Sequence, residues 1–150
     1  MRNILPSNIV VRNNDTLKDD WPISISNDKG EDYGLIRVDA AISNPPYSQA
    51  WDITGADTDP RFSEYGIAPK AKADYAFLLH SLYHLKPDGI MTIVLPHGVL
   101  FRGGDEKTIR QNLIERDNIE TVISLPANMF FGTGIPTIIM VLKKKRENND

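Results

Sequence analysis

The sequence predicts an α/β protein built around a mostly parallel sheet that ends in an antiparallel hairpin. From the middle of the chain onward, short apolar segments alternate with segments of helical periodicity, which is typical of βαβ units. The last two apolar segments have no helix between them, so we expect them to pair antiparallel. The 150 residues, 41% of them hydrophobic, are enough for one domain with a moderate core.

The N-terminal part of the chain is expected to contribute two strands joined by a loop. Ile9–Val11 predicts a short strand that runs into the polar turn Asn13–Thr16. Residues 18–34 are rich in Asp, Asn, Gly and Ser, a composition that favours a loop. Leu35–Ser43 is nearly continuous in apolar residues, as expected of a parallel strand that is buried on both faces.

The segment 48–73 shows neither helical nor strand periodicity and contains Gly55, Pro60, Gly66 and Pro69. Connections without secondary structure longer than about 12–15 residues are uncommon unless they are functional or disordered. Because this segment directly follows the suspected site described below, it is expected to be a mobile, substrate-facing loop. Simple disorder is the alternative.

The rest of the chain is expected to alternate helix and strand. Asp74 would cap a first helix that stops at Pro87–Gly89, and a buried strand at Ile90–Leu95 would follow. Asp105 would cap a second helix. The two final strands are predicted at Ile119–Leu125 and Ile135–Leu142, and the inward-facing helix residues are predicted to be Tyr75, Leu78, Leu79, Leu82, Leu85, Ile109, Leu113 and Ile114.

Composition and charge exclude several classes of protein. No apolar run approaches the ~18–20 residues of a membrane helix and no signal-peptide pattern is present, so a cytoplasmic protein is expected by default. The chain has no cysteine, which rules out disulfides and thiolate metal sites. Its net charge of −3 disfavours a domain that binds nucleic acid through phosphates alone. The basic segment Lys143–Arg146 is better explained as a solvated chain end.

The tetrapeptide Asn44-Pro45-Pro46-Tyr47 follows the strand predicted at Leu35–Ser43, and ligands of open α/β sheets bind beyond the carboxyl ends of strands. The side-chain oxygen of Asn44 and the carbonyl of Pro45 could accept the N–H bonds of an adenine amine and localise its lone pair. The proline rings fix φ and remove competing amide donors. Tyr47 could stack on the base. These groups suit methylation of a planar amine by positioning and electrostatic preorganisation.

Other features of the sequence have simpler explanations. On spacing alone, Asn44–Tyr47 is also compatible with a strand-ending turn that carries a surface tyrosine. His80 and His84 have a spacing that can bind metal, but the neighbouring leucines favour packing, and no metal site is predicted. Gly132–Gly134 lacks the third glycine and the following helix of a dinucleotide-binding loop, so it is interpreted as a tight turn that presents Phe130.

The strand followed by Asn44–Tyr47 resembles motif IV of amino-group methyltransferases, chiefly the DNA adenine-N6 enzymes. Further blocks across nearly the whole chain, in the expected order, resemble the modification subunit of type I restriction–modification systems. These blocks are Asn14–Leu17 with Asp20–Pro22, Lys72–Phe77, Ile93–Gly104 and Leu125–Thr137. The resemblance implies a partial Rossmann-like methyltransferase fold, S-adenosylmethionine as methyl donor, and DNA, a specificity (S) subunit and a restriction (R) subunit as partners.

Carried over to this sequence, the resemblance implies a role for each matching residue. Asn44, Pro45, Pro46 and Tyr47 would hold a flipped adenine. Asp15 would bond the adenine amine of S-adenosylmethionine, and Asp74 would line the cofactor pocket, although a helix cap also explains it. A second aromatic wall against the target base would come from Phe130 or Phe131, with Phe130 favoured.

One expected block is absent, because no Gly-rich cofactor loop precedes Asp15. Residues 1–150 are therefore expected to be the C-terminal part of a methyltransferase catalytic domain, and the isolated chain is expected to be inactive. Whether Met1 is a native start is left open. Two alternatives stay open for function: methylation of protein glutamine or RNA adenine, and a remnant that only docks other subunits.

Overall fold

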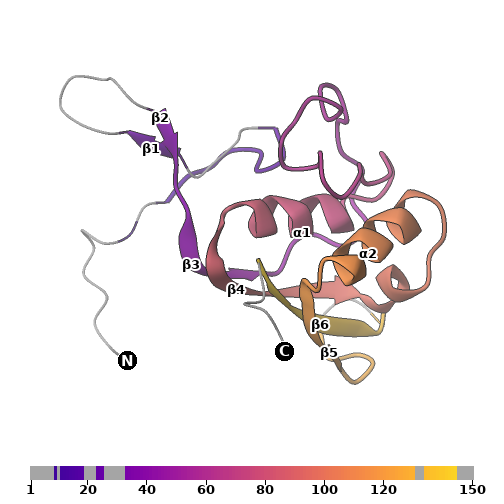
Figure 1. Ribbon diagram of the computed structural model, residues 1–150. Helices are drawn as coiled ribbons and strands as arrows, with labels where there is room; N and C mark the ends of the chain where they lie inside the picture. The colour runs from indigo at the N-terminus through magenta and orange to yellow at the C-terminus, as the bar shows by residue number, and fades with distance from the viewer. Residues whose placement is uncertain (1–8, 10, 19–22, 26–32, 131–133, 145–150) are drawn as a thin grey trace.

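A four-stranded sheet with two helices on one of its faces forms the centre of the chain (Figure 1). The computed structural model describes residues 9, 11–18, 23–25, 33–130 and 134–144. The elements in chain order are β1 Ile23–Ile25, β2 Tyr33–Leu35, β3 Val38–Ser43, α1 Asp74–Tyr83, β4 Leu85–Pro96, the 3₁₀ helix η2 His97–Leu100, α2 Asp105–Glu115, β5 Ile119–Ser124 and β6 Thr137–Lys143.

The sheet has the strand order β3-β4-β6-β5, and this order corrects the predicted topology. Strands β3 and β4 are parallel, whereas β6 is antiparallel to both of its neighbours. The antiparallel pairing of the last two strands is therefore confirmed, but a mostly parallel sheet is wrong. The physical reason is that β6 inserts between β4 and β5, so that two of the three strand pairings become antiparallel.

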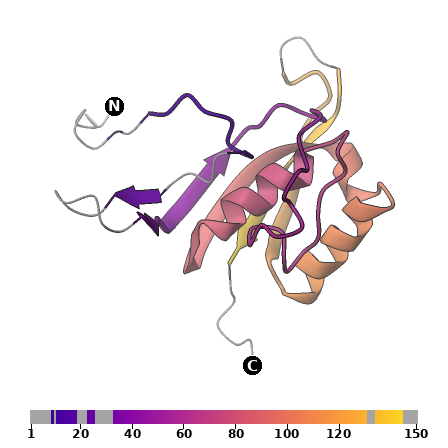
Figure 2. The ribbon, with the colours of Figure 1, turned by 90° about the horizontal axis from the view of Figure 1, so that it is seen from above.

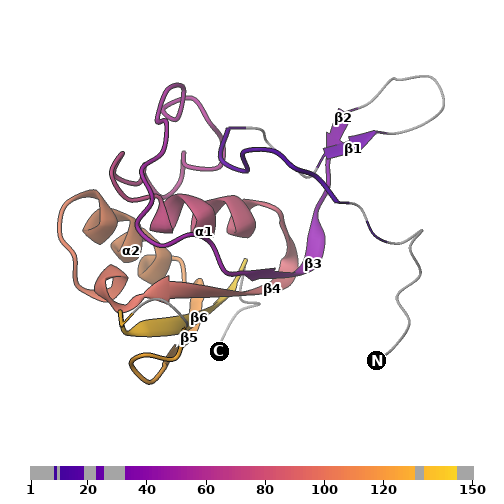
Figure 3. The same cartoon turned by 180° about the vertical axis from the view of Figure 1, so that it is seen from behind.

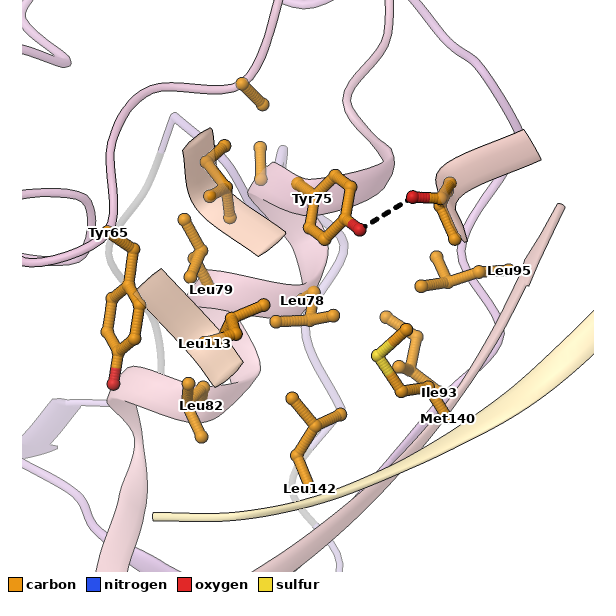
Figure 4. Packing of buried hydrophobic residues seen from close by; sticks show 14 of the residues in the cluster. Tyr65, Tyr75, Leu78, Leu79, Leu82, Ile93, Leu95, Leu113, Met140 and Leu142 are labelled. Atoms are coloured by element: carbon orange, nitrogen blue, oxygen red, sulfur yellow. Dashed lines mark hydrogen bonds between the residues drawn. The ribbon is translucent and has the colours of Figure 1, made fainter. Parts of the chain in front are cut away.

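The hydrophobic core lies between the sheet and the helices, and Figure 4 shows its packing. Tyr75, Leu78, Leu79 and Leu82 of α1 are buried, as their helical spacing predicted. The hydroxyl of Tyr75 donates to the carbonyl of Val99 at 2.8 Å, which satisfies the one polar atom that this ring brings into the core. The buried sheet residues alternate along β4 and β6: Met91, Ile93, Leu95, Ile138, Met140 and Leu142.

The opposite face of the sheet is open in the described part of the chain, since both helices lie on the same side (Figures 1 and 3). Ile42 of β3 is 90% exposed, and Ile90 of the neighbouring strand β4 and Ile123 of β5, at the opposite edge of the sheet, are also exposed. The prediction that the 35–43 segment is buried on both faces is therefore wrong. Its apolar sequence forms an edge strand whose side chains alternate between the core and the open face.

The N-terminal predictions fail in two places. Ile9 and Val11 lie outside any strand and are exposed, and residue 10 is outside the described residues. The 18–34 segment, predicted as loop, contains β1, and its last residues form part of β2, with which β1 pairs antiparallel. Both strands are only three residues long, too short for periodicity to separate them from a loop.

The helix boundaries also differ from the predictions. Asp74 and Asp105 are the first residues of α1 and α2, and neither helix has a side-chain cap, so both predicted N-caps are wrong. Helix α1 ends at Tyr83, before Pro87–Gly89, which lies within β4. The register of β3 against β4 shifts at this point, and such an irregularity accommodates a proline in a strand. Ile114, predicted to face inward, is 58% exposed.

The connection 48–73 has no regular secondary structure, as predicted, and it passes over α1 and α2 (Figure 2). It is not a freely exposed loop, however. Phe62, Tyr65 and Ala68 are buried in the core cluster, and the main chain of Ala73 donates to Gln49 across the base of the connection at 2.8 Å. The predicted mobile or disordered loop is therefore a packed layer on top of the helices. Within the described residues, no helix is long and apolar enough to cross a membrane.

Candidate functional site

The segment Asn44–Tyr47 starts directly at the carboxyl end of β3. Strands β3, β4 and β5 run in one direction, so the segments that follow them emerge at the same edge of the sheet. That edge carries Asn44–Tyr47, the 3₁₀ helix η2 and the loop between β5 and β6, which contains Phe130. The topology therefore brings together residues that are more than eighty positions apart in the chain.

Tyr47 links the two aromatic positions that the sequence singled out. Its ring meets the ring of Phe130 edge-on, with 6.3 Å between centroids and an interplanar angle of 75°. Its hydroxyl donates to the side-chain oxygen of Asn44 at 3.1 Å. Partial burial raises the pKa of Tyr47, so the phenol remains a donor at neutral pH. The structure thus places Asn44, Tyr47 and Phe130 together, whereas Phe131 lies outside the described residues.

The two prolines between Asn44 and Tyr47 differ in exposure. Pro45 is buried and Pro46 is exposed, so the segment leaves the sheet with one ring packed beneath it and the other facing outward. The side chain of Asn44 is exposed at the same edge. The two prolines have no main-chain N–H to donate. The side-chain polar groups of the tetrapeptide are those of Asn44 and Tyr47.

The residue after the tetrapeptide, Ser48, is held by Asp74. Ser48 has a positive φ of 49°, a conformation that is strained for a residue with a side chain. One carboxylate oxygen of Asp74 accepts the main-chain N–H of Ser48 at 2.7 Å, and the other accepts its hydroxyl at 3.3 Å. Asp74 is 0% exposed. These bonds stabilise the turn that fixes where Tyr47 leaves the sheet.

Arg102 completes this buried cluster. Its guanidinium donates to Asp74 at 2.8 Å and to Glu106 at 3.1 Å. Burial lowers the pKa of Arg102, but the bonds and charges of Asp74 and Glu106 outweigh it and raise the pKa above its usual value. The guanidinium lies against Gly98, where an added Cβ would approach Arg102 Nε to 2.7 Å. A side chain at position 98 would therefore force the guanidinium to shift from this position.

Asp15 lies in a separate turn. Its side-chain oxygen accepts the main-chain N–H of Leu17 at 3.0 Å, and its carbonyl accepts that of Lys18 at 3.2 Å. Its side chain is exposed, whereas Leu17 is buried. A cavity of about 360 Å³ lies beside this turn, lined among others by Leu17, Trp51 and Arg61. Asp15 is thus available to a ligand, while both oxygens of Asp74 are already hydrogen-bonded inside the protein.

The two histidines of α1 take part in packing and hydrogen bonds. His80 and His84 lie with ring centroids 4.7 Å apart. His80 Nδ1 is 3.0 Å from a guanidinium nitrogen of Arg61, which can only donate, and His84 Nδ1 donates to the carbonyl of Ile36 at 3.2 Å. In the described ranges, no group of three or more His, Asp or Glu side chains is suited to hold a metal.

Sequence reasoning missed Ser48, Arg61 and Arg102. An arginine in a polar segment carries no local sign that it will be buried, because its burial depends on partners brought together by the fold. Arg102 did lie within a block that resembled known proteins, but nothing in the sequence pointed to its contact with Asp74.

A sequence model of the family N-6 DNA Methylase matches residues 1–150. The methylase subunit of the type I restriction enzyme MpnII from Mycoplasma pneumoniae is 39% identical over 158 residues, covering 100% of this chain and 28% of that protein. The chain thus spans less than a third of the length of this curated relative.

Solved structures agree with this match. The methyltransferase subunit of a type I restriction-modification system from Streptococcus thermophilus aligns with a TM-score of 0.85 and 51% identity, over 97% of this chain and 29% of that one. A putative class I S-adenosylmethionine-dependent methyltransferase from Listeria monocytogenes has a TM-score of 0.60 at 22% identity, over 77% of this chain and 34% of that one. The latter likeness is one of fold.

Proposed function

The chain belongs to the N-6 DNA methylase family of type I restriction–modification methylase subunits, and on that premise we propose that it forms the base-binding part of a DNA adenine-N6 methyltransferase site. The observation that carries the proposal is the meeting of Asn44, Tyr47 and Phe130 at the carboxyl edge of the sheet. These groups offer an oxygen acceptor and two aromatic rings without a formal charge.

Asn44 would act as the acceptor for the target amine. Its amide oxygen has two lone pairs, so it can accept an N–H of the adenine while it still accepts the hydroxyl of Tyr47. The carbonyl of Pro45 would accept the second N–H. These two bonds favour a tetrahedral nitrogen whose lone pair is available for attack, and the proton leaves only after the nitrogen has been alkylated.

The two aromatic rings would hold the base after it leaves the duplex. Extrusion of a base costs a few kcal/mol, and stacking on an aromatic side chain recovers about 1–3 kcal/mol per base. Tyr47 and Phe130 come from different segments and meet at about a right angle. A base that lies flat on one ring would therefore lie at a steep angle to the plane of the other, which limits its orientation.

S-adenosylmethionine, which carries its methyl group on a positively charged sulfonium, would be the methyl donor. Asp15 fits a role in binding it, because an exposed carboxylate can accept the amine of an adenine ring. For Asp74 we propose a positioning role in place of direct cofactor contact, since its oxygens already bind Ser48 and Arg102. Residues 1–150 would form the C-terminal part of the catalytic domain, with weak or no cofactor binding and no activity when isolated.

DNA, a specificity subunit and a restriction subunit are the proposed partners. A net charge of −3 is unfavourable for phosphate binding by this region alone. Recognition of the DNA sequence would therefore rest with the specificity subunit, while this region holds the single base that reacts. Calorimetric titration of the isolated 150 residues with S-adenosylmethionine tests the cofactor part, with weak or no heat of binding expected.

The central experiment is Asn44→Ala in the whole gene product, assembled with its specificity subunit and assayed with tritium-labelled methyl donor and DNA. We expect methyl transfer to fall at least about 100-fold, the loss typical for removal of a preorganised acceptor or donor in an active site. Gln111→Ala on the exposed side of α2 is the matched control and should transfer methyl groups normally.

Near-normal transfer by Asn44→Ala would overturn the assignment of the site. Parallel reactions with RNA and with a glutamine-bearing protein identify the substrate class. Label that appears in either of these and not in DNA would replace adenine in DNA as the target.

A further inference from the structure

We propose that Arg61 is a positioning residue that holds the Asp15–Lys18 turn in place for the cofactor. The proposal rests on the proposed function, because it takes Asp15 as a cofactor contact. Arg61 lies in the 48–73 connection, more than forty residues from the turn in sequence. Figure 3 shows residues 11–18 running above α1 toward this connection.

The guanidinium of Arg61 binds the main chain of the turn directly. Its Nη1 donates to the carbonyl of Thr16 at 3.2 Å, and its Nη2 donates to the carbonyl of Leu17 at 2.7 Å. Contacts to main-chain carbonyls fix the path of the backbone irrespective of the side chains that the turn carries. The turn is thereby tied to the connection at the two residues that follow Asp15.

The remaining N–H donors of the same guanidinium contact Asp59 and His80. Nε and Nη2 donate to the Asp59 carboxylate at 3.0 and 2.6 Å, and Nη1 lies 3.0 Å from His80 Nδ1. The five N–H donors of an arginine are all used by these contacts and by the two carbonyls of the turn. Arg61 is 4% exposed. It therefore has no donor left for a ligand, and its effect on one must pass through the turn.

The connection from Arg61 to Asp15 runs through Leu17. The carbonyl of Leu17 accepts from Arg61, while its N–H donates to the Asp15 carboxylate at 3.0 Å. The buried side chain of Leu17 forms part of the core. A residue that is held at its carbonyl, its N–H and its side chain cannot rotate freely, so the Asp15 carboxylate is presented in one direction.

The test is a double-mutant cycle between Asp15 and Arg61 in the whole gene product. Asp15→Ala, Arg61→Met and the combined variant are titrated with S-adenosylmethionine, and steady-state kinetics give KM and kcat separately. Arg61→Lys keeps the charge but cannot span four partners. Arg116→Met is the matched control, because the side chain of Arg116 is exposed and forms an ion pair with Glu64, which is also exposed.

We expect Arg61→Met to weaken S-adenosylmethionine binding roughly tenfold, which is about 1.4 kcal/mol. In the Asp15→Ala background the same substitution should change binding less than about twofold, since non-additivity marks residues that act through one another. Arg61→Lys should lie between wild type and Arg61→Met. KM for the cofactor should rise with little change in kcat, and Arg116→Met should behave as wild type.

Additive losses in the cycle, or normal binding by both Arg61 variants, would overturn the proposal. If Arg61→Met does not fold, Arg61→Lys decides. If neither variant folds, Arg61 is a determinant of the whole fold and the positioning role is wrong. Normal binding by Asp15→Ala would overturn both this proposal and the cofactor role of Asp15, while the Asn44→Ala assay still stands as an independent test of the base-binding site.

Discussion

The strand tip Asn44–Tyr47 and the buried cluster of Asp74, Arg102 and Glu106 lie next to each other but differ in charge and burial. The tip is uncharged and partly exposed, and a single side-chain hydrogen bond links Tyr47 to Asn44. The cluster is charged and largely buried, and Asp74 alone accepts three hydrogen bonds. Ser48 joins the two regions, since it follows Tyr47 and binds Asp74.

This difference suits the tip to contact with a substrate and the cluster to holding the backbone in place. A group that must accept hydrogen bonds from a substrate needs unused capacity, and the tip retains it. A group that fixes the backbone works best when each of its atoms has a partner inside the protein, because an unpaired buried charge is costly. Substitutions at the tip should therefore change activity with little effect on stability, whereas substitutions in the cluster should change stability first.

The largest expected effect on stability is that of Asp74→Ala. Removing the carboxylate leaves Arg102 and the N–H of Ser48 without their partner, and loss of one member of a buried ion pair costs about 3–5 kcal/mol. Urea unfolding measures this loss, with Asp57→Ala, an exposed aspartate, as a control that should stay within about 0.5 kcal/mol of wild type. Asn44→Ala should also unfold near the wild-type midpoint; a loss as large as that of Asp74→Ala would remove the contrast.

The second prediction concerns a further ion pair, in which the buried Arg61 binds the partly buried Asp59. Burial raises the pKa of Asp59, but hydrogen bonds from the side chain and main chain of Arg61, together with the charge of Arg61, outweigh it and hold the pKa below its ordinary value. Because the folded state then binds a proton less readily than the unfolded chain, ionised Asp59 stabilises the fold at neutral pH, and this contribution is lost as the pH falls through the lowered pKa.

Asp59→Asn should therefore lower the unfolding temperature at neutral pH by the equivalent of about 2 kcal/mol, the value of a hydrogen bond to a charged group. The difference from wild type should shrink as the pH drops below the ordinary range of an aspartate. Thermal unfolding followed across this pH range measures it. A difference that does not depend on pH would show that the ionisation of Asp59 has no part in the stabilisation.

The sequence allowed the tip to be predicted better than the cluster, for a physical reason. Asn44–Tyr47 is a contiguous segment after an apolar strand, so both its composition and its place at a sheet edge can be inferred locally. The contact of Tyr47 with Phe130 depends on the parallel direction of β3 and β5, and the resemblance to known methyltransferases favoured Phe130 before any geometry was known. The chemical role of these residues stays a prediction.

The cluster and the sheet order depend on long-range contacts that local patterns do not encode. Asp74 at the start of a helical pattern has the sequence signature of an N-cap. Its carboxylate instead accepts hydrogen bonds from Ser48 and Arg102, which are distant in sequence. Likewise, alternating strands and helices indicate a parallel sheet, and nothing local reveals that β6 inserts between β4 and β5. The errors at β1 and β2 arose because three-residue strands are too short for a periodic signal.

The third prediction tests the aromatic pair within the tip. Tyr47→Ala and Phe130→Ala each remove one ring, and we expect each to weaken binding of an oligonucleotide with an unpaired target adenine by about 1–3 kcal/mol. Fluorescence anisotropy measures the affinity. Phe101→Ala is the control, since this exposed phenylalanine packs edge-on against His97 and has no proposed contact with the base. Unchanged affinity in both tip variants would mean that the rings do not hold the base.

The smallest expected effect is that of Tyr47→Phe, which keeps the ring and removes only the hydroxyl that donates to Asn44. A neutral hydrogen bond of this kind contributes about 0.5–1.5 kcal/mol, so methyl transfer should fall between about twofold and tenfold. Oligonucleotide affinity should stay at the wild-type level because stacking is retained, and urea unfolding should be unchanged because the bond lies at the surface. If Tyr47→Phe is as inactive as Asn44→Ala, the hydroxyl takes part in the reaction itself, and the tip contains a second polar group with a direct role.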